Sequence, residues 1–422
     1  MKRLIQYAVH QPLFIVLGTL LFVMAGVIAF KNLSVEAFPD VTDTQVTVIS
    51  LFPGRAAEEV EKQVTLPVET ALAGLPNSIR LFSHTQFGLS YTVVTYDDSA
   101  NVNLARQQVM ERLNGVDLPP GAQVNIAPNA TPVGEIMRYR LRGDGKSTTD
   151  LRTQQDWVVE RALRQVPGVA DVVAMGGFIK QYEVQPDLDK LRAYKLTFQN
   201  LLDALGRGNS NAGGSYVAQG SQQFAIRGIG LLRSADDIGR IVLDSRNGTP
   251  ILIRDVAQIK LGSVPRLGIT GQDHDDDAVI GIVIMRKGEN ASEVLHGVKD
   301  KIEQLNERGL PPGVQIVPFY DRTWLMGKTL TTVFHNLVEG ALLVSLVLYI
   351  FLSNLRASLA VVVVIPLALL ATFMGLKIMG VPANLLSLGA MDFGIIVDGA
   401  VIVIENIMHR LEKDSENMSE SE

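Results

Sequence analysis

Four long apolar stretches constrain this chain more than any other feature, because each is long enough to cross a lipid bilayer. The first runs from Leu13 to Phe30 without a charged residue. A helix of about 20 apolar residues spans the roughly 30 Å hydrocarbon core. Three more stretches, 334–353, 357–380 and 385–408, are separated by only a few residues. The sequence therefore predicts four transmembrane helices, with the last three in a tight antiparallel group.

A cleaved signal peptide is the alternative interpretation of the first stretch. Its apolar part is longer than the roughly 7 to 15 residues of a typical signal peptide, and Lys31-Asn32-Leu33 offers no small-x-small cleavage site. An uncleaved anchor is the better interpretation. Near the second stretch, Trp324 predicts a separate interfacial helix that turns the chain into the bilayer.

The basic residues near the spans predict the orientation of the chain. If all four segments cross, the basic residues at 2–3, 356 and 410–413 fall on the same side. The positive-inside rule makes that side cytoplasmic. The N-terminus is then cytoplasmic, and the long polar region from Leu33 to near Met326 lies on the far side of the membrane.

That polar region contains a repeated pattern of strands and helices. LPPGAQVNIAP at 118–128 and LPPGVQIVPFY at 310–320 echo each other, and each follows an alternating strand pattern and an amphipathic helix pattern. Helix patterns at 56–76 and 150–169, each flanked by strand patterns, form a second type of unit. Together they predict two βαβ-βαβ modules of the ferredoxin-like type.

The fold class expected is therefore an α+β membrane protein with two ferredoxin-like modules and an insert of mixed β structure. The expected segments are a first transmembrane helix (1–32), a first module (33–133), a second module in two parts (134–180 and 273–325) around the insert (181–272), three transmembrane helices (326–413) and an acidic tail (414–422). The insert is rich in Gly, Ser, Asn and Gln, then in short strand patterns, and we expect it to contact another subunit.

Three carboxylates lie inside the fourth apolar stretch, in MDFGIIVDGAVIVIEN at 391–406. A charge at mid-bilayer depth costs at least about 2.5 to 3.5 kcal/mol, so such residues usually face a protein interior and mark ion or proton paths. Asp398 and Glu405 are seven residues apart, which places them within about 20° of the same helix face. Asp392 points about 120° away on an ideal helix. Asp398 and Glu405 therefore suit a proton relay by geometry, whereas Asp392 does not.

Two other interpretations of these carboxylates stay open. The stretch could be a buried amphipathic helix of a soluble domain. Intramembrane aspartyl proteases also place Asp residues in spans, but they need two Asp on separate helices, one in a Gly-x-Gly-Asp motif. Here both Asp lie on one helix, and the sequence Gly389-Ala390-Met391-Asp392 does not match that motif.

Two places outside the spans could hold a metal ion. QDHDDD at 272–277 combines His274 with four Asp, and imidazole and carboxylate suit Zn²⁺, Co²⁺ or Ni²⁺. Adjacent residues on a turn rarely converge on one ion, so a solvated hairpin is expected there. Glu135 opens the second module at the hinge between the two modules, and alone it is interpreted as a carboxylate at a strand edge.

Composition excludes several functions. The chain has no cysteine, which rules out disulfides and thiolate metal sites, and its net charge of −6 without a basic block argues against nucleic acid. No G-x-x-x-x-G-K-[ST] pattern for binding nucleotide phosphates is present, so the chain is not expected to hydrolyse ATP. Any process that it drives across the membrane must then take its energy from an ion gradient.

Several motifs together resemble a known family. They are LSVEAFPDVTDTQVTV, PGRAAEEVEKQVTLPVE, GVADVVAMGG, RKGENA, SNLRAS and, above all, DFGIIVDGAVIVIEN. They resemble the N-terminal half of the heavy-metal efflux (cobalt-zinc-cadmium type) branch of the resistance-nodulation-division transporters, up to about Lys413. The members of this family consist of two similar halves, so the chain is expected to be an incomplete N-terminal portion.

The resemblance implies a function. Members are homotrimeric, proton-driven pumps of the bacterial inner membrane that export cations with a periplasmic adaptor and an outer-membrane channel; they are antiporters, not enzymes, and need no cofactor. The proton-relay positions fall on Asp392, Asp398 and Glu405. The DFG-x-x-VDG form resembles the divalent subgroup, which exports zinc, cobalt, cadmium or nickel, and Glu135 matches a position implicated there in zinc binding. The modules would be porter subdomains and the insert part of the docking domain. A drug or organic-solute exporter, or a membrane-anchored protease or assembly protein, is the alternative.

Overall fold

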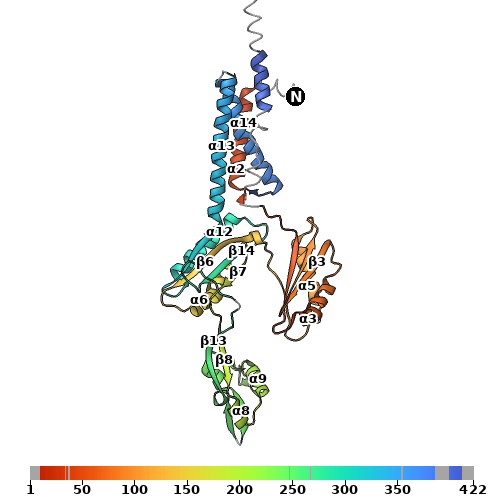
Figure 1. Ribbon diagram of the computed structural model, residues 1–422, viewed down its shortest axis with the longest axis vertical. Coiled ribbons are helices and arrows are strands. Elements are labelled where there is room, and N and C mark those ends of the chain that lie inside the picture. Colours follow the sequence, from red (N-terminus) through yellow and green to blue (C-terminus); the bar gives the residue numbers. More distant parts are fainter. Residues whose placement is uncertain are drawn as a thin grey trace, which may run out of the picture.

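The computed structural model describes residues 10–33, 35–36, 39–246, 248–266, 268–352, 355–384 and 399–410. The long helices form a bundle at one end of an elongated molecule, and the β-containing units lie towards the other end (Figure 1). The α+β fold class expected from the sequence is confirmed.

Three helices of the described residues are long and apolar enough to cross a membrane. They are α2 (Pro12–Lys31), the part Phe334–Phe351 of α13 (Arg322–Leu352), and α14 (Leu355–Met379). Most of the predicted fourth span lies outside the described residues, and only its end, 399–410, is seen as a helix. Three of the four predicted spans thus have their counterparts, and the fourth stays a prediction.

Tight packing holds the described helices together. A Cβ at Gly26 of α2 would stand 2.6 Å from Cβ of Leu370, so only glycine permits this approach of α2 to α14. The ring of Phe30 contacts Phe373, with 4.9 Å between ring centroids. Pro366 lies inside α14, which stays helical, as expected where neighbouring helices support a break in the hydrogen-bond ladder.

The second span does not have the interfacial helix that the sequence predicted. Helix α13 begins at Arg322, directly after the strand that ends at Asp321, and continues without a break to Leu352. Trp324 lies in its first turn and is 73% exposed. The prediction of a separate element was wrong because the last strand of the second module leads straight into the membrane helix, and no turn is needed.

The first module is a four-stranded antiparallel sheet with helices on one face. Its strands are β2 (Gln45–Leu51), β3 (Ser78–Gln86), β4 (Leu89–Tyr96) and β5 (Gln123–Ile126), in the order β3-β4-β2-β5. The helices are α3 (Ala57–Val60), the π-helical turn η1 (Glu61–Thr65), α4 (Leu66–Leu72) and α5 (Val102–Leu113). This strand order is ferredoxin-like. Alternating strand residues such as Val46 and Val48 pack against Val68 and Leu72.

The second module repeats this arrangement. Its strands are β6 (Glu135–Gly143), β7 (Val169–Met175), β14 (Val279–Met285) and β15 (Val314–Asp321), in the order β15-β6-β14-β7. The helical segments are α6 (Thr148–Gln154), η3 (Gln155–Val159), α7 (Glu160–Leu163), α12 (Ala291–Gln304) and η4 (Leu305–Gly309). The short 3₁₀ turn η2 (Pro132–Gly134) precedes β6.

The insert leaves the second module after β7 and returns before β14. Strands β8 (Lys180–Pro186) and β13 (Ala257–Ser263) form the antiparallel ribbon that leads to it (Figure 1). Between them lie α8 (Leu188–Ala193), α9 (Phe198–Arg207), β9 (Ala212–Gln219), β10 (Gln222–Gly228), α10 (Ala235–Gly239), β11 (Val242–Arg246), β12 (Thr249–Leu252) and α11 (Ile253–Val256). Within the described ranges, β9 and β10 pair only with each other, and their hairpin exposes Tyr216, Phe224 and Ile226.

A short parallel pair joins the bundle to the modules. Strand β1 (Val35–Glu36) follows α2, and β16 (Ala383–Asn384) follows α14; Val35 is paired with Ala383. The chain that leaves the first span is therefore tied to the link that follows the third.

The packing of Tyr139 on Gly281 yields a stability prediction. A Cβ at Gly281 would stand 2.1 Å from Cζ of the buried Tyr139 ring, whose hydroxyl donates to Oε1 of Gln155 at 3.0 Å. We expect Gly281→Ala to destabilise the second module by about 1 to 3 kcal/mol, because the ring must leave its site. Thermal unfolding of the detergent-solubilised chain, followed by tryptophan fluorescence, measures this.

The matched control is Gly206→Ala on α9, where the added Cβ meets nothing within 4 Å. It should leave the unfolding temperature unchanged or raise it slightly, because alanine is favoured over glycine in a helix by up to about 1 kcal/mol. An unfolding temperature for Gly281→Ala equal to that of the control would contradict the packing argument.

Candidate functional site

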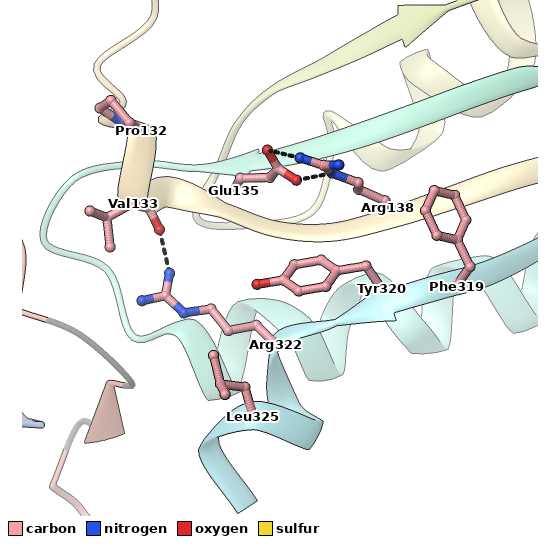
Figure 2. A pocket seen from close by; sticks show the side chains of 8 residues that line it. All are labelled: Pro132, Val133, Glu135, Arg138, Phe319, Tyr320, Arg322 and Leu325. Atoms are coloured by element: carbon pink, nitrogen blue, oxygen red, sulfur yellow. Dashed lines mark hydrogen bonds and ion pairs between the residues drawn. The ribbon is translucent and has the colours of Figure 1, made fainter. Parts of the chain in front are cut away.

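The candidate site is a pocket between the second module and the first turn of α13 (Figure 2). Its volume is about 740 Å³. Strands β6 and β15 and helix α13 supply most of its wall, and the lining residues are Pro132, Val133, Glu135, Arg138, Phe319, Tyr320, Arg322 and Leu325. Glu135 is the one lining residue with a carboxylate, so the sequence-predicted metal residue lies in this pocket.

A close backbone contact fixes Glu135 at the start of β6. Gly134 closes the 3₁₀ turn by donating its N–H to the Thr131 carbonyl at 2.8 Å. A Cβ at Gly134 would stand 2.7 Å from the carbonyl oxygen of Met285, so a side chain does not fit there. Glycine thus allows β6 to begin against the end of β14, which places the next residue, Glu135, at the pocket wall.

A β-bulge turns Glu135 towards Arg138. Val283 of β14 pairs with Met137, but Ile284 pairs with Glu135, so Ile136 is an extra residue in β6. Ile136 and Met137 are both fully buried, which breaks the usual alternation of faces. Residues three apart in a regular strand point to opposite faces. The bulge therefore brings Glu135 and Arg138 to the same face.

These two side chains form an ion pair that uses both carboxylate oxygens. Nε of Arg138 donates to Oε1 of Glu135, and Nη2 donates to Oε2 at 3.0 Å. The Glu135 side chain is 28% exposed and that of Arg138 48%. The hydrogen bonds to Glu135 raise the pKa of the Arg138 guanidinium above its ordinary value. Sequence patterns alone do not predict this pair, because it depends on the bulge.

A second carboxylate lies in the same row of the sheet. Ile284 pairs with Glu135 on one side and with Asp171 of β7 on the other. Neighbouring strands are about 4.8 Å apart, so the two acidic residues are separated by roughly 10 Å of sheet. Asp171 is held by Arg164, whose Nε donates to Oδ1 at 2.7 Å. The one sequence signal for Asp171 is a charge within an apolar strand.

Arg322 forms the boundary between this pocket and the membrane helices. It is 3% exposed and donates from Nη1 to the carbonyl oxygen of Val133 (Figure 2). A buried guanidinium needs such a partner, because an unpaired buried charge is costly. The same arginine lines a second pocket of about 320 Å³, next to β1 and β16.

Polar contacts near the second pocket connect the segment between β1 and β2 to the second module. Asp40 accepts a hydrogen bond from the Thr131 hydroxyl at 2.8 Å, and Lys287 donates to the Thr42 carbonyl at 2.7 Å. Burial raises the pKa of Glu36 above its ordinary value, although the charge of Arg322 opposes this shift. The segment after α2 is therefore held by the second module.

The structure bears on one of the three predicted relay carboxylates. Asp392 and Asp398 lie outside the described residues. Glu405 lies on the helix 399–410 and is exposed. It is one turn beyond Val401, which packs with Ala400 and Ile404 against the buried face of α14, so Glu405 borders the packed face.

The QDHDDD motif forms a solvated hairpin, as expected. Gln272 and Asp275 exchange backbone hydrogen bonds, each of 3.0 Å, across a tight turn. Asp275 pairs with Arg140, and Asp277 pairs with Arg266 at 2.8 Å. Across the described ranges, no group of three or more His, Asp or Glu residues could hold a metal ion. A metal ion at Glu135 would thus need further ligands from outside the described residues.

Comparisons with known proteins give one consistent family. The model of the AcrB/AcrD/AcrF family matches residues 4–422. The chain is 39% identical to Protein HelA of Legionella pneumophila over 97% of this chain and 40% of that protein. It is 39% identical to the cobalt-zinc-cadmium resistance protein CzcA of Cupriavidus metallidurans over 97% of this chain and 39% of that protein.

A solved structure agrees with these relatives. The crystal structure of a heavy metal efflux pump, crystal form II, is similar with a TM-score of 0.89 and 41% identity, over 97% of this chain and 41% of that chain. The chain thus spans about two fifths of the length of the proteins it matches. Because the family model matches almost every residue, the chain belongs to the AcrB/AcrD/AcrF family.

Proposed function

We propose that this chain is the N-terminal portion of a proton-driven exporter of divalent heavy-metal cations of the zinc, cobalt, cadmium and nickel class. The observation that carries the proposal is the likeness over 97% of the chain to a heavy metal efflux pump, at a TM-score of 0.89 and 41% identity. The relative from Cupriavidus metallidurans, whose name refers to cobalt, zinc and cadmium resistance, supports the same class of cargo.

Proton coupling is assigned to Asp392, Asp398 and Glu405. Carboxylates within an apolar span are expected at ion or proton paths, and Asp398 and Glu405 share one helix face. Glu405 borders the face that packs on α14, where a neighbouring helix can shield it from lipid. The lack of an ATP-binding loop pattern in the chain fits a gradient as the energy source.

The cation is assigned to the pocket that contains Glu135. A carboxylate oxygen is a suitable ligand for Zn²⁺ or Co²⁺, and the pocket of about 740 Å³ has room for an ion with its water. Since the described residues supply one carboxylate there, the other ligands would come from the rest of the pump.

The assembly we propose follows the family. The chain lies in the bacterial inner membrane with its N-terminus in the cytoplasm, and the two modules act as periplasmic porter subdomains. The insert belongs to a docking domain, and the complete pump is a homotrimer that works with a periplasmic adaptor and an outer-membrane channel. The exposed apolar hairpin β9–β10 supports a subunit contact, because such surfaces usually mark protein interfaces.

The relay assignment predicts the effect of Asp398→Asn in the complete pump. Cells that carry this variant should tolerate zinc and cobalt no better than cells without the pump, because the amide cannot take up and release a proton. Growth at increasing metal concentration measures tolerance, with protein level checked by immunoblot. Asp276→Asn, an equal change on the exposed hairpin, should retain tolerance. Full tolerance of Asp398→Asn at a normal protein level would rule out the relay role.

The hairpin assignment predicts a change in oligomeric state. Val217 and Phe224 form a cross-strand pair, and they are 49% and 50% exposed. Replacing both with Ser should shift the complete pump from trimer to monomer, because the apolar contact with the next subunit is lost. Light scattering after size-exclusion chromatography gives the mass. The control Leu261→Ser changes an equally exposed apolar residue of β13, 59% exposed, and should leave the trimer intact. A trimeric double variant would refute the contact.

A further inference from the structure

We propose that Arg138 is a release residue, whose guanidinium competes with a divalent cation for the carboxylate of Glu135. This inference rests on the proposed function, because it takes Glu135 as a cation ligand. It adds a residue that sets how tightly the cation is held. Arg138 would not touch the cation and would act only through Glu135.

The guanidinium of Arg138 engages both oxygens of the Glu135 carboxylate. Arg138 donates to Oε1 from Nε and to Oε2 from Nη2, the latter at 3.0 Å. Such forked, charge-assisted pairs are among the strongest hydrogen-bonded contacts in proteins. A bound Zn²⁺ would stand about 2.0 to 2.2 Å from a carboxylate oxygen, in the space where the N–H groups now point. The ion and the guanidinium carry charges of the same sign and seek the same lone pairs of the carboxylate, so each weakens the binding of the other.

The pocket allows the guanidinium to leave while the strand stays in place. The backbone of Arg138 is fixed on both sides, by pairing with Ile282 of β14 and with Tyr320 of β15. Its side chain, however, is 48% exposed and borders the pocket of about 740 Å³. Release therefore requires a change of side-chain rotamer only.

No other lining side chain can replace Arg138 in this role. Among the described residues that line the pocket, the second cation is Arg322, which is buried and donates to the Val133 carbonyl. Figure 2 shows its guanidinium turned towards Val133 and away from Glu135. With one carboxylate and two guanidinium groups, the lining is positive overall and disfavours a bound cation.

The bulge at Ile136 makes the competition a built feature of the strand. A regular strand would point Glu135 and Arg138 to opposite faces, and the pair could not form. Bulges are common beside functional sites, where they redirect a side chain. The bulge, with its two adjacent buried residues in β6, is therefore what allows the carboxylate of Glu135 to contact the guanidinium of Arg138.

The competition has a measurable size. When a site is free for only a fraction of the time, the apparent dissociation constant is the intrinsic constant divided by that fraction. If Arg138 leaves Glu135 free about one tenth of the time, removal of the guanidinium tightens binding about tenfold. An exporter benefits from such a site, because the returning arginine expels the ion.

The experiment measures Zn²⁺ affinity of the complete, detergent-solubilised pump, which supplies the other ligands, by competition with a fluorescent chelator. Arg138→Met should bind Zn²⁺ about tenfold more tightly than the unchanged pump, and Glu135→Gln should bind it at least about tenfold more weakly. The double variant should be no tighter than Glu135→Gln alone, because Arg138 acts through Glu135. Arg138→Lys keeps the charge but loses the forked pair, and its affinity should lie between that of the unchanged pump and that of Arg138→Met.

The matched control is Arg142→Met. Arg142 lies on the same strand and is exposed, and its substitution removes the same charge. It should leave the affinity unchanged, whereas tightening equal to that of Arg138→Met would reduce the effect to general charge and overturn the proposal.

The outcomes distinguish the release role of Arg138 from the cation site at Glu135. If Glu135→Gln weakens binding but Arg138→Met does not tighten it, the release role is wrong and the cation site stands. If Glu135→Gln has no effect, or if neither the unchanged pump nor its Arg138→Met variant binds Zn²⁺, the assignment of Glu135 fails, and the release role fails with it.

Discussion

The bilayer imposes the constraint on which the rest of this structure depends. Helices α2 and α13 must each cross it, so the chain between them begins and ends at the same face of the bundle. Everything from β1 to β15 is therefore one excursion with both ends fixed side by side. The order of the parts follows, because the second module must return the chain to α13 and so has its last strand, β15, directly before that helix.

Where the excursion meets the bundle, polar groups of the backbone and of side chains make the connections. The pair β1–β16 links the segments after α2 and α14, Lys287 and Thr131 hold the segment after β1, and Arg322 is buried beside Val133. Each of these contacts ends on a backbone carbonyl or a carboxylate. Such contacts satisfy buried donors and also fix geometry, whereas apolar packing alone would let the module slide on the bundle.

Much of this architecture follows from local patterns. Alternation at 45–51 predicts a strand because one face is buried, and the apolar run at 279–285 predicts a strand with both faces largely covered. The echo of LPPGAQV and LPPGVQI predicts two similar modules. The features that local patterns miss depend on pairing between distant segments. The bulge at Ile136 exists only because β14 pairs on one side of β6, and the burial of Arg322 exists only because η2 lies over it. The candidate site was thus found through Glu135, but its partner was not. The relay residues Asp392 and Asp398 stay predictions.

The pocket and the bundle share one continuous helix, and this bears on how a gradient could act on the proposed cation site. Arg322 and Leu325 line the pocket, and both lie in the first turn of α13. That helix continues unbroken to Leu352 and packs on α14 through Ala341 and Val344. The end of the predicted fourth span packs on the same cluster through Ala400, Val401 and Ile404, and Glu405 borders these residues. A change of charge on the fourth span that shifts α14 would therefore displace α13, and with it the wall of the pocket opposite Glu135. Helix α13 has no break between Arg322 and the span, so the wall of the pocket and the membrane part of the helix belong to one element.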